Sequence, residues 1–335
     1  MKNAKKNTII IMLILALVLF FIMKDDFNNI MDVLRKANLW WLLIGMIFII
    51  LYWALKSLGL YILVRKHTKK LKFINVFHQG VITEFFNGVT PFSTGGQPMQ
   101  VYMLNKKGIS GANATNMIVQ SFLFFQTALI IHGILAVTLN YKFDILNVNS
   151  GLWTLVMLGF LINTIVGIGL LFISFSTKFN NFVGKKIIKI GHKLKIVKNQ
   201  EETLIKWSGK LAEYHNNAEE LRKDKLLFIK GFTSNFFALA CLYIIPLFVA
   251  LSMGLENINI LNAMVASALV LLIGNFVPIP GGSGGIEFGF LKFFGQFLLG
   301  PILAASLIMW RFITYYFGII VGGIALSFFK GDEKK

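Results

Sequence analysis

The sequence predicts an all-α protein of the polytopic membrane class, a helix bundle with two inverted repeats that each contain a broken, re-entrant helical hairpin. Three observations predict this fold. Hydrophobic residues form 56% of the 335-residue chain and charged residues only 14%, with a mean hydropathy of +0.69. Soluble domains carry about 25% charged residues. The apolar residues gather into long runs, and glycine and proline interrupt two of the segments between them.

The apolar runs account for the predicted spans, since most of them reach the roughly 20 residues that cross ~30 Å of hydrocarbon. The first run has no small-residue cleavage site and further spans follow it, so we expect a retained helix and not a removed signal peptide. The runs are Thr8–Met23, Leu39–Val64, Met117–Leu139, Leu152–Phe175, Leu226–Met253, Ile260–Val277 and Ile302–Phe329.

The net charge of +18 comes from basic residues that lie between the apolar runs. This distribution is typical of the positive-inside rule and argues against nucleic-acid binding by this chain. When every Lys/Arg-rich segment is placed in the cytoplasm, one consistent topology results. We therefore expect a multi-pass protein of a bacterial cell membrane with both termini in the cytoplasm.

The longest basic segment, about residues 178–225, has apolar residues at helical spacing in both halves. This pattern predicts a cytoplasmic helical hairpin whose lysine-rich first helix rests on anionic headgroups. The alternative is a solvated connector.

Residues 73–104 and 260–300 must each enter the membrane and return to the side from which they came. Each contains a proline- and glycine-rich break, at residues 90–98 and 278–285, that a continuous helix would not tolerate. The two segments lie between long spans of opposite direction, which predicts inverted repeats over about residues 39–140 and 226–330. Two coincidental loops, or two full spans in each segment, would also satisfy the charge pattern.

Each break is expected to end in a new helix, with Pro98 at its first position or Ser283 as its N-cap. Helix starts present free N–H groups and partial positive charge, so two of them near the midplane would bind an anionic group such as a lipid phosphate. The residues expected to line this lipid or anion site are Asn87, Pro91, Ser93, Thr94, Gly95, Gly96, Gln97, Gly281, Gly282, Ser283, Gly284 and Gly285.

Several ionisable residues lie in apolar surroundings, where charge is unfavourable unless it faces a cavity or a partner. The functional interpretation makes Arg311 and Lys56 further phosphate contacts, with Glu84 and Glu287 coupling movement to a proton or cation. In the structural alternative, carboxylates pair with Arg311 to hold the repeats together, and Lys56 extends to the membrane interface. For Arg311 we favour the phosphate.

Other chemistries leave no sequence signal. The single cysteine, Cys241, excludes an intramolecular disulfide and a multi-cysteine metal site. There is no phosphate-binding loop of the Gly-x-x-x-x-Gly-Lys-Ser/Thr type, and no polar stretch is long enough for an ordinary enzyme domain. We therefore predict no catalytic residues, no metal and no cofactor.

The run Pro-Phe-Ser-Thr-Gly-Gly-Gln-Pro at residues 91–98, with Glu84–Asn87 before it and Pro278–Gly285 and Glu287 later, resembles the lysylphosphatidylglycerol synthase transmembrane family. The resemblance covers essentially the whole chain. It implies a lipid-handling membrane domain that, in full-length members, translocates aminoacylated phosphatidylglycerol and supports resistance to cationic peptides. Those members also carry a soluble domain that transfers lysine from lysyl-tRNA, which this chain is expected to lack.

The favoured function is flippase-like movement of an anionic phospholipid, with or without an aminoacyl group, or of a lipid-linked intermediate. One alternative is a phosphatidylglycerol lysyltransferase component that acts with a separate aminoacyltransferase. Another is a scaffold for envelope enzymes such as glycosyltransferases.

Overall fold

The computed structural model describes residues 27–193, 223–255, 258–274, 277 and 279–329, with isolated positions between 199 and 219. The predicted span Thr8–Met23 lies outside the described residues. Five described helical segments are long and apolar enough to cross a membrane, and no strand occurs in these ranges, which confirms the all-α, multi-pass fold. The spans are α3 (Leu39–His67), α6 (Gly111–Phe143), α7 (Ser150–Phe175), α10 with α11 (Lys225–Tyr243 and Ile245–Ser252), and α14, η3 and α15 (Gly300–Arg311, Phe312–Tyr316 and Phe317–Ser327).

Polar side chains determine where several spans begin. Asn38, Ser110 and Asn149 accept hydrogen bonds from the first backbone N–H groups of α3, α6 and α7. Such caps satisfy donors that have no partner inside the helix. At the start of α10 the cap is Asp224, which also lies 2.9 Å from Nζ of Lys66. The hydrogen bond from Lys66 holds the pKa of Asp224 below its ordinary value.

The two predicted hairpins are made of shorter helices. The first joins α4 (Phe73–Gly88) to α5 (Gly96–Lys106), and the second joins α12 (Ile260–Gly274) to α13 (Gly285–Phe294). At 1.5 Å per residue these helices are only about 15 to 24 Å long, less than the ~30 Å of hydrocarbon. Their lengths favour re-entrant hairpins over pairs of full spans.

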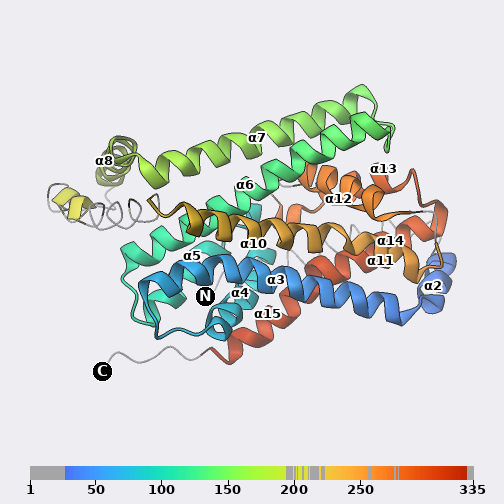
Figure 1. Ribbon diagram of the computed structural model, residues 1–335, viewed down its shortest axis with the longest axis horizontal. Helices are drawn as coiled ribbons and strands as arrows, with labels where there is room; N and C mark the ends of the chain where they lie inside the picture. Colours follow the sequence, from blue (N-terminus) through green and yellow to red (C-terminus); the bar gives the residue numbers. More distant parts are fainter. Residues whose placement is uncertain are drawn as a thin grey trace.

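The hairpins point toward each other from opposite ends of the bundle (Figure 1). Helix α5 lies toward the end that also holds α8 (Thr177–Lys193), whereas α13 lies toward the other end, which holds α2 (Phe27–Lys36). Between the hairpins the two breaks are in contact. The hairpins therefore meet inside the bundle.

Long helices enclose the hairpins in a regular pattern. Helix α3 packs along α10, α4 packs against α15, and α12 packs against α6. Glycine allows α4 and α15 to approach closely, since a Cβ on Gly322 of α15 would lie 2.6 Å from the carbonyl oxygen of Val81 in α4. Small residues at such crossings let helix backbones approach in membrane bundles.

The basic segment at 178–225 begins with a helix, as expected, namely α8. Most of the second predicted helix lies outside the described residues. Trp207, which belongs to it, has its indole against Gly184 of α8. The hairpin as a unit, and its contact with headgroups, stay predictions.

Candidate functional site

The two breaks share an unusual backbone conformation. Each contains a single 3₁₀ turn that starts at a proline, η1 (Pro91–Ser93) and η2 (Pro280–Gly282). The two residues after the proline have positive φ, 53° and 52° in η1 and 65° and 62° in η2. Glycine adopts such angles readily, and η2 has glycine at both positions. In η1 they are Phe92 and Ser93, so the first break holds backbone strain of the kind that gathers at functional sites.

This match aligns the proline of η1 with Pro280.

The helix that follows the first break begins at Gly96 with Gly95 as its N-cap, so the prediction that Pro98 takes the first position was wrong. The backbone N–H of Gly95 donates to Oγ1 of Thr90 at 2.8 Å, and that of Gly96 donates to Oδ1 of Asn87 at 3.1 Å. The Asn87 and Thr90 side chains come before η1, and by accepting these bonds they start the helix two residues earlier than predicted. Two of the N–H groups expected to face a ligand are thus used inside the hairpin.

The glycines of the first break are explained by packing. A Cβ on Gly96 would collide with the side chains of Asn87 and Thr83, and a Cβ on Gly95 would lie 2.6 Å from Cγ2 of Thr90. Their small size therefore lets α5 fold back closely on α4.

The helix after the second break begins at Gly285 with Gly284 as its N-cap, so the prediction of Ser283 as the cap was wrong by one residue. The reason is a carboxylate three residues later, because Oε2 of Glu287 accepts a 2.6 Å hydrogen bond from the N–H of Gly284. Ser283 instead donates its hydroxyl hydrogen to the carbonyl of Pro280 at 2.9 Å.

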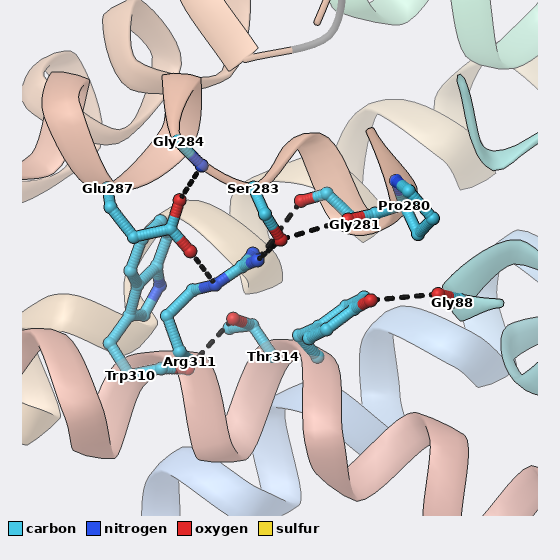
Figure 2. A network of polar contacts seen from close by, with 10 residues as sticks. Gly88, Pro280, Gly281, Ser283, Gly284, Glu287, Trp310, Arg311 and Thr314 are labelled. Atoms are coloured by element: carbon cyan, nitrogen blue, oxygen red, sulfur yellow. Dashed lines mark hydrogen bonds and ion pairs between the residues drawn. The ribbon is translucent and has the colours of Figure 1, made fainter. Parts of the chain in front are cut away.

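Arg311 holds the second break from the adjacent span (Figure 2). Its Nε lies 2.8 Å from Oε1 of Glu287, and its Nη2 donates to the carbonyl of Gly281 at 3.1 Å and to Oγ of Ser283 at 3.3 Å. The Arg311 and Glu287 side chains are 6% and 8% exposed. The guanidinium also lies 4.4 Å from the ring centroid of Tyr315. Of the partners that the sequence left open for Arg311, the structure provides the Glu287 carboxylate.

A second ion pair joins α3 to the first hairpin. Nζ of Lys56 donates to Oε1 of Glu84 at 2.9 Å. It also lies 5.3 Å from the ring centroid of Tyr52 and 5.6 Å from that of Phe125, a placement that adds cation–π attraction. Lys56 therefore points into the bundle and not to the interface. This pair is more open than the first, with the side chains 28% and 18% exposed.

A cavity of about 710 Å³ lies where the breaks meet. Residues of the long helices and of both hairpins form its walls, together with η1, η2 and the π-helical turn η3. The helices are α3, α4, α5, α6, α7, α10, α12, α13, α14 and α15. Of the predicted site residues, nine line it: Lys56, Glu84, Asn87, Ser93, Thr94, Gln97, Gly281, Gly282 and Arg311.

Comparison with known proteins shows the family to which this chain belongs. The profile of the lysylphosphatidylglycerol synthase TM region matches residues 8–322. The chain belongs to this family. It is 23% identical over 315 residues to a UPF0104 membrane protein of Archaeoglobus fulgidus, with 89% of each chain covered. It is 21% identical over 262 residues to an uncharacterised protein of Mycoplasma genitalium, covering 73% of this chain and 67% of that one.

Membership of the lysylphosphatidylglycerol synthase transmembrane family confirms the resemblance read from residues 84–98 and 278–287. The family description agrees with a multi-pass fold and with a lipid-handling role. The names of these two relatives specify no substrate.

In this family member the remaining predicted residues support the breaks without lining the cavity. They are Pro91, Gly95, Gly96, Ser283, Gly284, Gly285 and Glu287. Glu287 and Ser283 act through Arg311, and Gly95 and Gly96 through the packing of α5 on α4.

Sequence reasoning missed several residues of the site. Tyr315 donates a 2.8 Å hydrogen bond from its hydroxyl to the carbonyl of Gly88 and so joins the last span to the first hairpin. Its position four residues after Arg311 places both on one helix face, which was a usable signal. Two further lining residues are Gln126 and Asn163, and Nε2 of Gln126 donates to the carbonyl of Asn163 at 2.8 Å. Both amides interrupt apolar runs, and polar residues at such depth are themselves a signal.

Proposed function

We propose that this protein moves an anionic phospholipid or lipid-linked intermediate between membrane leaflets, with the head group passing through the cavity between the two breaks. The cavity itself carries the proposal. Its volume of about 710 Å³ is in the range of ligand pockets, and it combines apolar walls with the cations Lys56 and Arg311. A phosphate is the group common to the candidate lipids, and lysine and arginine are its usual partners.

The packing pattern supports two inverted repeats, over about residues 39–140 and 226–330. The contact of α4 with α15 has its counterpart in that of α12 with α6, and α3 pairs with its own counterpart α10. The breaks share a proline followed by two left-handed residues. Paired, interrupted segments in oppositely directed halves are typical of membrane transporters, with the substrate site at their interface.

Orientation and location are also part of the proposal. The connection between α3 and α4 and the helix α8 are rich in lysine and lie toward one end of the bundle (Figure 1). The positive-inside rule assigns this end to the cytoplasm of a bacterial cell membrane. A head group would then leave or enter the cytoplasmic leaflet beside the first hairpin.

Reconstitution tests the proposal. Purified protein is placed in phosphatidylcholine vesicles with fluorescent phosphatidylglycerol, and a membrane-impermeant quencher reports the leaflet of the label. We expect label to exchange between leaflets faster than in protein-free vesicles. Val166→Trp should slow exchange because Val166 lines the cavity, whereas its neighbour Ile165, 59% exposed and outside the lining, should accept Trp without effect.

The outcomes separate the candidate functions. Wild-type protein that binds phosphatidylglycerol without moving it would contradict the proposal and favour a scaffold or a lysyltransferase component. If Val166→Trp and Ile165→Trp changed the exchange rate equally, the cavity would not be part of the transport path.

A further inference from the structure

The ionisable groups at the hairpins form a balanced set before any lipid enters. They are two cations and two carboxylates, arranged as the pairs Lys56–Glu84 and Arg311–Glu287. Their formal charges sum to zero. Entry of a singly charged phosphate would therefore leave one uncompensated negative charge inside the bundle, where charge is strongly unfavourable.

The two pairs differ in what they do for the fold. The Arg311–Glu287 pair is buried. Arg311 also donates to the carbonyl of Gly281, and Glu287 accepts from the N–H of Gly284, so both side chains bind the backbone of the second break. Separating this pair would release the break. The Arg311 guanidinium can donate a further hydrogen bond to an acceptor in the cavity. Glu287, however, stays in place because it caps α13.

The Lys56–Glu84 pair joins α3 to α4 but, among the described residues, does not hydrogen-bond the backbone of either break. Both residues line the cavity, both are partly exposed, and one hydrogen bond of 2.9 Å joins them. An ammonium group has three donors, so Lys56 can turn from the carboxylate to a phosphate oxygen without loss of a charged partner. Glu84 would then be a carboxylate without a cation beside a second anion.

Building on the proposed function, we propose that Lys56 and Glu84 form an exchange pair that couples lipid binding to a proton. Lys56 transfers its hydrogen bond from Oε1 of Glu84 to the lipid phosphate, and the Glu84 carboxylate takes up one proton from the aqueous phase. The cavity stays neutral. When the lipid leaves, Glu84 releases the proton and the pair forms again, so one proton accompanies each singly charged lipid.

The surroundings of Glu84 single it out as the proton acceptor. From α3 it faces Lys56 and, beyond it, Tyr52, while α15 presents Gly318 at its Cβ. Arg311, Tyr243 and Tyr315 are the other titratable residues of the cavity wall within the described ranges. Glu84 is the one carboxylate in that lining, since Glu287 lies behind Arg311.

Proton uptake on binding gives a direct test. Detergent-solubilised protein in weak buffer is titrated with phosphatidylglycerol micelles near pH 7, and a pH-indicator dye records protons taken up while a separate assay records bound lipid. We expect about one proton per lipid bound by wild type, as linkage requires if one group is ionised free and protonated in the complex. Glu84→Gln should bind the lipid with no proton uptake.

The lysine has its own test. Lys56→Gln should weaken binding by about tenfold or more, as expected for loss of a charge-assisted hydrogen bond. Lys292→Gln is the matched control, because Lys292 lies over the ring of Phe288 and outside the cavity lining. Inorganic phosphate serves as a second probe. Proton uptake with phosphate alone, and none with the lipid, would assign the exchange pair to a soluble anion and overturn its role with lipid.

Failure of this inference differs from failure of the proposed function. Wild-type protein that binds and moves phosphatidylglycerol without taking up a proton refutes the exchange pair and leaves the transport proposal standing. Absence of both lipid binding and lipid movement refutes the transport proposal and the exchange pair with it. The number of protons taken up per lipid bound by wild type tests the exchange pair even if Glu84→Gln does not fold.

Discussion

The hydroxyl of Tyr315 donates a 2.8 Å hydrogen bond to the carbonyl of Gly88 and so ties the last span to the tip of the first hairpin. The two residues belong to different proposed repeats, 227 positions apart in the chain. The bond is buried, with Tyr315 only 8% exposed.

Removal of this hydroxyl should destabilise the protein. In Tyr315→Phe the Gly88 carbonyl loses a buried donor, which costs about 1–3 kcal/mol. The midpoint of thermal unfolding in detergent should fall accordingly. Tyr141→Phe provides the control, because Tyr141 is 90% exposed and its hydroxyl should contribute nothing measurable. Equal midpoints for wild type and Tyr315→Phe would show that the bond does not hold the hairpin.

The Arg311–Glu287 pair should behave as a structural unit. Arg311→Gln leaves a buried carboxylate without its cation, and breaking a buried pair costs about 3–5 kcal/mol. We expect a sharp loss of folded protein, measured as the monodisperse fraction in size-exclusion chromatography. Neutralising both residues, Arg311→Gln with Glu287→Gln, should restore much of it. If Arg311→Gln alone folds as well as wild type, the pair is not a structural unit.

Arginine at this position should also not be replaceable by lysine. Lysine keeps the charge but lacks the planar fork with which Arg311 reaches Glu287, Gly281 and Ser283 together. Arg311→Lys should therefore fold better than Arg311→Gln but unfold below wild type. An unfolding midpoint equal to that of wild type would show that charge alone suffices.

Backbone strain in the first break should be measurable. Ser93 has φ of +52°, which is unfavourable for any residue except glycine. Ser93→Gly should therefore raise the free energy of unfolding by up to about 1 kcal/mol, the low end of such strain. Thr94→Gly is the contrasting variant, since Thr94 has φ of −92° and donates its hydroxyl hydrogen to the Pro91 carbonyl at 3.0 Å. Stabilisation by both glycines, or by neither, would contradict the assignment of strain to residue 93.

Orientation can be checked with single cysteines in a Cys241→Ala background. A cysteine at Asn147, between α6 and α7, should react with a membrane-impermeant maleimide added to intact cells. A cysteine at Lys70, in the basic connection between α3 and α4, should react only after the cells are opened. The opposite pattern would invert the proposed topology.

Much of the fold was predictable because hydropathy marks the spans directly. The apolar runs located α3, α6, α7, α10 with α11, and the last span, and the proline and glycine breaks marked both hairpins. Helix ends were less accurate. Helix α6, for example, starts at Gly111, six residues before the apolar run at Met117, because Ser110 caps a polar first turn that hydropathy ignores.

The candidate site was predicted only in part, for a physical reason. The sequence named all four ionisable residues, but their pairing depends on contacts between separate elements, such as Lys56 of α3 with Glu84 of α4. The start of α5 likewise depends on Asn87, whose Oδ1 accepts a hydrogen bond from the N–H of Gly96 nine residues later. The cap by Glu287, three residues after Gly284, in contrast follows a local spacing that could have been recognised.

Contact between the tips of the two hairpins has a consequence for membrane permeability. The turns η1 and η2 are in contact, and on the proposed path of the head group they would lie between the two aqueous sides. We expect this zone of contact to act as the seal of the protein as well as its substrate site, so that any movement wide enough for a head group also opens a transient route for small ions. Transport and ion leak should then rise and fall together when side chains at the tips, such as Phe92, are made smaller.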